Sequence, residues 1–211
     1  MLASAVSYAL KAAALVEPAD LARPTPCPQW HLGLLLRHLS ASMADLEEAI
    51  ATGRLDADPY AVPHVRPLVA PGGGDPVELL RDRAADLLYT MFTAPLRTVT
   101  VAGLPIPPEL MLAAGAMEIA VHGWDIYVAC GRGRGVPAAL ARPLIRLFPQ
   151  LVTVRQGLFA SPVAMPPCAS PGDRLIAYLG RDPSAGRRGA RHQRPPPREP
   201  AGRVPTLVTR E

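Results

Sequence analysis

The chain has few cysteines, few aromatic side chains and almost no lysine. Its three cysteines, Cys27, Cys130 and Cys168, are widely spaced and include no C-x-x-C pair. An odd number of scattered thiols does not suit a disulfide framework, so we expect a reduced, cytoplasmic setting. Aromatic residues make up only 5% of the chain, whereas Ala and Leu, which favour helices, are abundant. This composition predicts a fold rich in α-helix.

Long apolar runs are also absent. No uninterrupted apolar stretch approaches the ~20 residues that a bilayer-spanning helix needs. The apolar stretch over residues 2–16 contains Lys11, the only lysine, and has no basic segment before it. We therefore predict that this stretch is a helix rather than a signal peptide, and we expect no membrane partner.

The positive charge is concentrated near the C-terminus. The formal net charge is +4, but residues 184–211 hold seven arginines and two glutamates, so the rest of the chain is close to neutral. A neutral body does not favour nucleic-acid binding. Because residues 184–211 are rich in Arg and Pro and poor in apolar side chains, we predict a disordered tail there. One folded domain is expected over residues 1–183.

Apolar residues recur with helical spacing along most of this domain. Leu32, Leu35, Leu39, Met43 and Leu46 follow the spacing of one helical face, for example. The fold class is therefore predicted to be all-α. The expected helices span residues 2–16, 31–52, 75–92, 108–130, 137–148 and 172–179.

Three stretches interrupt the helical pattern. The segment TPCPQW (25–30) is expected to be a rigid loop, because proline fixes its own φ and fits poorly inside a helix. Residues 54–74 contain four prolines and end in three glycines, which predicts a long loop. Residues 96–101 (LRTVTV) alternate and are β-branched, which predicts a short strand or extended arm.

Two polar residues lie together on the almost wholly apolar helix expected over residues 108–130. Glu118 and His122 are four positions apart, so they share one face of that helix. Buried carboxylates and imidazoles need partners. A mutual hydrogen bond would satisfy them, and so would a metal ion, which both groups can ligate.

His38 is a third polar residue on an apolar helix. It lies near the core stripe of the helix over residues 31–52, and a bundle could place that helix beside Glu118 and His122. Two histidines and one glutamate would leave a coordination position open, as in catalytic zinc sites. The residues alone favour the other interpretation, a buried His–Glu hydrogen bond with His38 in the core.

Three segments resemble a known family. TPCPQWHLGLLLRHL (25–39) and AMEIAVHGWDIYVACG (116–131) resemble the two signatures of the metal-binding domain of mycothiol-dependent maleylpyruvate isomerases, within the DinB-like superfamily. GDRLIAYLGRDP (172–183) resembles the closing segment of an uncharacterised metal-binding branch of that family. The three segments occur in the family's order.

The resemblance implies a fold, a metal and a co-substrate. The fold would be a DinB-like antiparallel four-helix bundle, here with short extra C-terminal helices. His38, Glu118 and His122 would bind a divalent metal, usually zinc, near one end of the bundle. Some relatives use mycothiol, a small sugar-linked thiol, which the metal would hold as a nucleophilic thiolate.

Four residues near these segments have further expected roles. His31 lies seven positions before His38 and could be an extra ligand, a lid residue or an exposed residue of the first helical turn. Asp125 could orient His122 or bond to a loop. Arg181 is expected to tie down the last helix, and Cys27 to pack under its loop.

Two functions fit these observations. The first is a metal-dependent transferase or isomerase that joins a mycothiol-type thiol to a small electrophile. The alternative is a non-catalytic metal-binding or partner-binding helical bundle. A bundle without metal remains a third interpretation. Either a monomer or a homodimer is expected.

Overall fold

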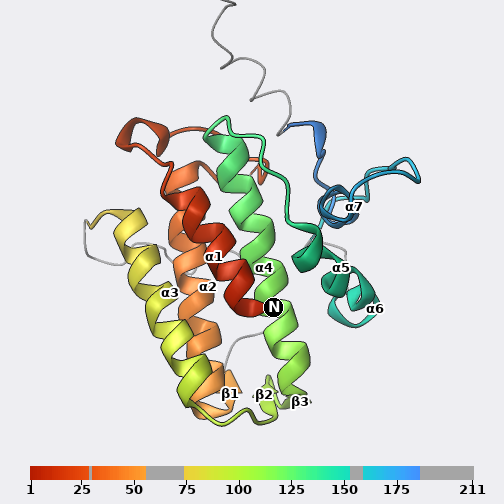
Figure 1. The fold of residues 1–211 in the computed structure, drawn as a ribbon. Coiled ribbons are helices and arrows are strands. Elements are labelled where there is room, and N and C mark those ends of the chain that lie inside the picture. The colour runs from red at the N-terminus through yellow and green to blue at the C-terminus, as the bar shows by residue number, and fades with distance from the viewer. Residues whose placement is uncertain (29, 56–73, 153–158, 186–211) are drawn as a thin grey trace, which may run out of the picture.

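Four long helices form the body of the protein. The computed structural model describes residues 1–28, 30–55, 74–152 and 159–185. In Figure 1, α1 and α4 run in one direction and α2 and α3 in the other. The predicted all-α bundle is confirmed, and most of the predicted tail lies outside the described residues. The four helices are α1 (Leu2–Ala13), α2 (Leu32–Thr52), α3 (Pro76–Thr93) and α4 (Pro108–Ala129).

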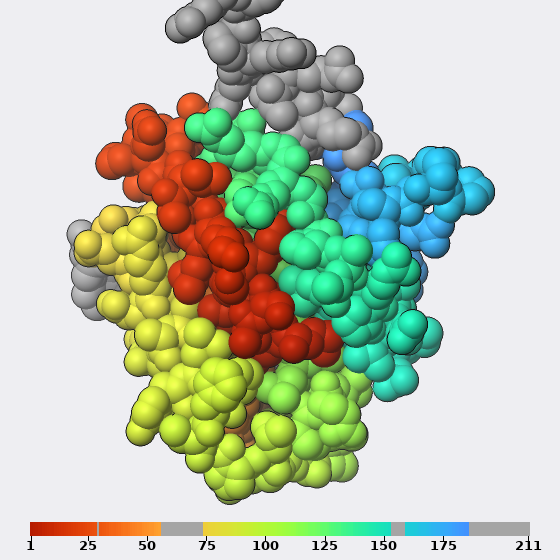
Figure 2. All heavy atoms as spheres, viewed as in Figure 1, coloured from red at the N-terminus to blue at the C-terminus, as the bar shows by residue number. Residues whose placement is uncertain are grey.

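The packing of the bundle is uneven. The most extensive contacts join α1 to α4 and α2 to α3, and α2 also contacts α4. Figure 2 shows α1 as a red band between the yellow α3 and the green α4, with its outer face on the surface. The contact between α2 and α4 brings together the helices that carry His38 and Glu118.

The ends of α2 follow from its sequence. His31 caps the beginning of the helix, where its side chain accepts a hydrogen bond from the backbone N–H of Leu34. Gly53 ends the helix at φ 75°, a left-handed conformation that glycine adopts readily. Between these ends, the leucine stripe that includes Leu35 and Leu39 is fully buried.

The helix α4 is buried for most of its length, as its apolar sequence predicts. A Cβ added at Gly123 would lie 3.0 Å from the Tyr8 ring and 3.1 Å from the Cα of Ala9, both on α1. The absence of a side chain at Gly123 therefore allows α1 and α4 to approach closely. Gly123 directly follows His122, so this contact holds that part of α4 against α1.

A small sheet lies at one end of the bundle. It consists of β1 (Arg54–Leu55), which is parallel to β2 (Val99–Val101), and β3 (Leu104–Ile106), which is antiparallel to β2. The predicted strand over residues 96–101 is thus confirmed only in its second half. The predicted loop over residues 54–74 begins with β1, and residues 56–73 lie outside the described residues.

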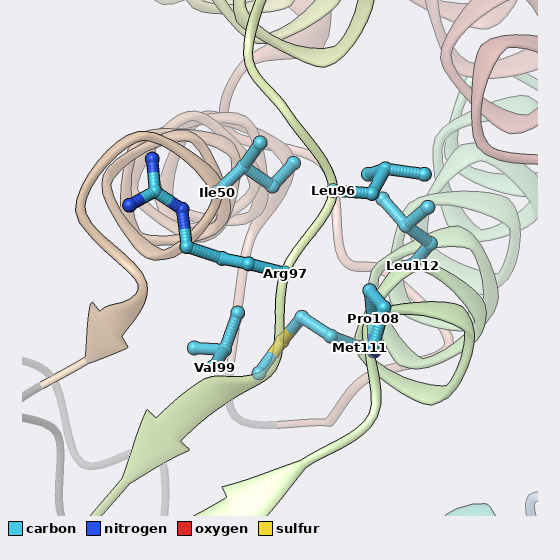
Figure 3. Close-up of a pocket in the computed structure, with 7 residues that line it drawn as sticks. All are labelled: Ile50, Leu96, Arg97, Val99, Pro108, Met111 and Leu112. Carbon is cyan, nitrogen blue, oxygen red and sulfur yellow. The ribbon is translucent and has the colours of Figure 1, made fainter.

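An apolar depression lies beside this sheet. Figure 3 shows its lining, in which Ile50 of α2 and Met111 of α4 lie on either side of the segment that carries Leu96 and Arg97. Its volume is about 10 Å³, which is close to the space for one water molecule. A site of this size cannot hold a substrate.

Short helices complete the structure. The 3₁₀-helix η1 (Pro18–Asp20) follows α1, and α5 (Ala138–Arg146), α6 (Phe148–Leu151) and α7 (Pro171–Tyr178) follow α4. The helix predicted over residues 137–148 is interrupted at Leu147, so its end belongs to α6. None of the described helices has both the length and the apolarity that crossing a bilayer requires.

The close α1–α4 contact predicts the effect of Gly123→Ala. Alanine is the better helix former by ~1 kcal/mol, but overpacking costs about 1–3 kcal/mol, and here one neighbour is backbone. We expect a net loss of ~1–2 kcal/mol in the free energy of unfolding, measured with urea. Gly135→Ala is the control, because nothing lies within 4 Å of its added Cβ. A neutral or stabilising Gly123→Ala would contradict the tight contact.

Candidate metal centre

The structure brings His38, Glu118 and His122 together. The Nε2 atom of His38 lies 2.8 Å from Oε1 of Glu118, and Nε2 of His122 lies 3.1 Å from the same oxygen. One ligand atom from each residue lies within 4.8 Å of the other two. His38 comes from the second turn of α2, and the other two come from consecutive turns of α4. The juxtaposition that the sequence could only suggest is therefore present.

A second carboxylate holds the far side of His122. Its Nδ1 donates to Oδ2 of Asp125 over 2.9 Å, and Asp125 is fully buried. Arg181, which follows α7, donates from Nε to Oδ1 and from Nη2 to Oδ2 of Asp125, each over 2.8 Å. Both predicted roles of Asp125 are thus present at once: it orients His122 and bonds to a loop. Arg181 ties down the end of α7 through Asp125.

This pattern requires positive charge between the carboxylates. The two ring nitrogens of His122 face Asp125 and Glu118, and carboxylate oxygens only accept hydrogen bonds. Either both nitrogens carry protons, or Nε2 faces a cation. Burial lowers the pKa of His122, but Glu118 and then Asp125 outweigh it and raise this pKa to about 9. Without a metal, His122 is therefore an imidazolium near neutral pH.

The pKa values of the two carboxylates, Glu118 and Asp125, shift downward. Burial tends to raise the pKa of Glu118, but His122 and His38 outweigh it and hold this pKa well below its usual range. Burial likewise opposes ionisation of Asp125, whose pKa Arg181 and His122 lower. Both groups are therefore anionic near neutral pH, while Arg181 supplies only one permanent positive charge.

A rigid loop covers one side of the centre. The hydroxyl of Thr25 lies 2.9 Å from the carbonyl oxygen of Cys27 and 2.8 Å from that of Trp30, and it accepts the N–H of Cys27. The Trp30 ring centroid lies 4.2 Å from that of His38 and 5.8 Å from that of His122. Cys27 is half-buried against the core, as expected. The loop therefore presents an indole to both histidines.

His31 belongs to the frame of the loop and not to the centre. It is the exposed N-cap of α2, and its Nδ1 lies 2.9 Å from the carbonyl oxygen of Leu21. Of its three predicted roles, exposure in the first turn is the one that the structure supports. It is not in the group of potential ligands among the described residues.

The centre is open on the side of Glu118. The side chain of Glu118 is 39% exposed, whereas those of His38 and His122 are 16% and 6% exposed. A separate hollow of about 350 Å³ lies behind the centre, between Pro24–Pro26, the end of α4 and the residues around Arg181. The exposed edge of Glu118 is where solvent or a small molecule can approach.

The family comparison covers all three candidate ligands. Residues 2–127 match the model of the mycothiol maleylpyruvate isomerase N-terminal domain. The chain is 26% identical over 173 residues to an uncharacterized protein that occurs in two strains of Mycobacterium tuberculosis. That alignment covers 79% of this chain and 87% of the relative. No solved structure matches the chain.

The raised pKa of His122 predicts how stability depends on pH in protein stripped of metal by a chelator. Because the folded pKa of about 9 exceeds the unfolded value of 6.5, this stabilisation is complete below pH 6.5 and is lost as the pH rises through 9. We expect a loss on the order of 3 kcal/mol over that interval, measured by urea unfolding. The His122→Gln variant should lack this loss. A flat wild-type profile would contradict the assignment.

The buried Asp125–Arg181 pair predicts a large effect of Asp125→Asn. Arg181, whose side chain is only 12% exposed, would be left without its counter-charge. We expect a loss of ~3–5 kcal/mol in the free energy of unfolding. Asp86→Asn is the matched control, because the Arg83–Asp86 pair is exposed and should contribute at most ~0.5 kcal/mol. Equal effects of the two changes would show that Asp125 is not essential.

Proposed function

Because the chain belongs to the mycothiol maleylpyruvate isomerase N-terminal domain family, we propose that it binds one divalent metal ion through His38, Glu118 and His122. One observation carries the proposal. His122 has a carboxylate at each ring nitrogen, so the point where Nε2 meets Glu118 must hold either a proton or another cation.

The donor set suits such an ion. Imidazole nitrogen and carboxylate oxygen are the donors of catalytic zinc sites, with metal–ligand distances of about 2.0–2.2 Å. The hydrogen bond from His122 to Asp125 fixes the tautomer that leaves Nε2 unprotonated towards the ion. When His122 is neutral, Glu118 and Asp125 bring two negative charges against the single positive charge of Arg181, so the centre carries a net negative charge that attracts a cation. Zinc is the first candidate.

Three protein ligands leave room for a fourth partner, and we propose a thiol. A bound metal lowers the pKa of a thiol, so that a mycothiol-type co-substrate would be a thiolate near neutral pH. The residues of the chain would orient the centre: Asp125 holds His122, and the exposed side of Glu118 admits the thiol and a small electrophile. The reaction class would be thiol transfer or isomerisation in a reducing, cytoplasmic setting.

Metal binding is tested by titration of chelator-treated protein with zinc. We expect one equivalent to bind and to raise the melting temperature. The His38→Ala and His122→Ala variants should bind at least about 100-fold more weakly, because each loses a ligand. Apparent affinity should rise by about tenfold per pH unit below pH 9, because the metal displaces one proton from His122.

The control is Glu78→Gln, which changes an exposed carboxylate of α3 outside the centre and should leave zinc affinity unchanged. The proposal fails if the wild type binds no stoichiometric metal and its melting temperature does not respond to zinc. Turnover of an electrophile that depends on both mycothiol and metal would support the enzyme. Metal binding without such turnover would support the non-catalytic module instead.

A further inference from the structure

The two candidate histidine ligands are held in different ways. A metal-bound histidine ordinarily donates its second ring nitrogen to a carboxylate, a carbonyl or water, which fixes the orientation of the ring. His122 follows this rule through Asp125. His38 bonds only through Nε2, to Glu118, and its Nδ1 has no hydrogen-bond partner among the described residues. A ring contact can orient the His38 imidazole in place of such a hydrogen bond.

Trp30 is in the position to do so. Its ring centroid is 4.2 Å from that of His38, with 37° between the ring planes, so the two rings are in direct contact. Trp30 is only 7% exposed, although it lies in a loop. The indole therefore covers the imidazole and keeps water away from that side of it.

The backbone that carries the indole is restrained. The backbone N–H of Trp30 donates to the carbonyl oxygen of Cys27 over 3.0 Å, and the Thr25 hydroxyl donates to the Trp30 carbonyl oxygen over 2.8 Å. Pro24 pairs with His31 across the base of the loop. Prolines at 26 and 28 further restrict the backbone. The backbone of Trp30 is thus held in place, and its ring packs against the His38 ring.

We propose that Trp30 is a positioning residue that does for His38 what Asp125 does for His122. Its indole holds the His38 imidazole with Nε2 towards Glu118 and thereby sets the metal affinity of the centre. The electron-rich indole also favours a ring that becomes partly positive on binding a cation. The inference rests on the proposed metal-binding function.

A competing role for Trp30 is simple core packing. A residue that only fills space would affect the stability of the fold but not the affinity of the folded protein for zinc. Trp124 provides the comparison. It is the only other tryptophan and is 3% exposed, and among the described residues it makes no ring contact with His38 or His122. Zinc affinity therefore separates the two roles.

The experiment compares Trp30→Leu, Trp30→Phe and Trp124→Phe by zinc titration against a chromophoric chelator. We expect Trp30→Leu to bind zinc about 10- to 100-fold more weakly, as when an outer partner of a metal ligand is lost. Trp30→Phe should recover most of the affinity, because it retains an aromatic face. Trp124→Phe should bind zinc like the wild type, whatever it does to urea stability.

The outcomes separate the inference from the proposed function. A wild type that binds no zinc overturns both. A wild type that binds zinc, with unchanged affinity in folded Trp30→Leu or equal weakening in Trp124→Phe, overturns the inference alone. If Trp30→Leu does not fold, Trp124→Phe gives the second test, because Trp30 is then the sole indole. Its emission must change in proportion to bound zinc up to one equivalent, and unchanged emission overturns the inference.

Discussion

The centre depends on a negative charge that is partly buried where α2 meets α4. Glu118 projects from an apolar helix, and its carboxylate oxygen lies within hydrogen-bond distance of imidazoles from two helices. Removing a carboxylate from water without a partner is unfavourable, and His38 and His122 compensate for this on the side of Glu118 that faces away from solvent. The need for a partner of opposite charge continues beyond Glu118. Asp125 stabilises a charged His122, and because Asp125 is itself buried, it needs Arg181. These interactions thus join α2, α4 and the residues that follow α7.

This chain of interactions joins segments that are distant in the sequence. Trp30 approaches from the loop before α2, whereas Arg181 approaches from the residues after α7. The match to the family model ends at residue 127, so Arg181 completes the centre from outside the matched region. The C-terminal helices therefore do more than cover α4: they deliver the guanidinium that keeps Asp125 ionised and aligned with His122.

Local sequence patterns were enough to predict much of the fold and part of the candidate centre. Helical periodicity located α2 and α4, and the four-residue spacing predicted that Glu118 and His122 share a face. The approach of His38 required the family resemblance, because periodicity does not say which helices are neighbours. The Asp125–Arg181 contact spans 56 positions and leaves no local pattern. The strands β1 and β3 are too short to show an alternating pattern. The break between α5 and α6 at Leu147 was missed because apolar residues keep their helical spacing across it.

In the proposed centre, a proton and a metal ion would compete for the same position between Nε2 of His122 and Glu118. With a proton on Nε2, His122 bridges two carboxylates and the cluster is electrically satisfied. With a cation there, the tautomer held by Asp125 is already the ligating one, so the ring need not turn. Among the described residues, Nδ1 of His38 has no such partner, and the ring contacts Trp30 instead. One of the two proposed histidine ligands is thus oriented by a charged hydrogen bond and the other by ring packing, and the exposed side of Glu118 stays accessible.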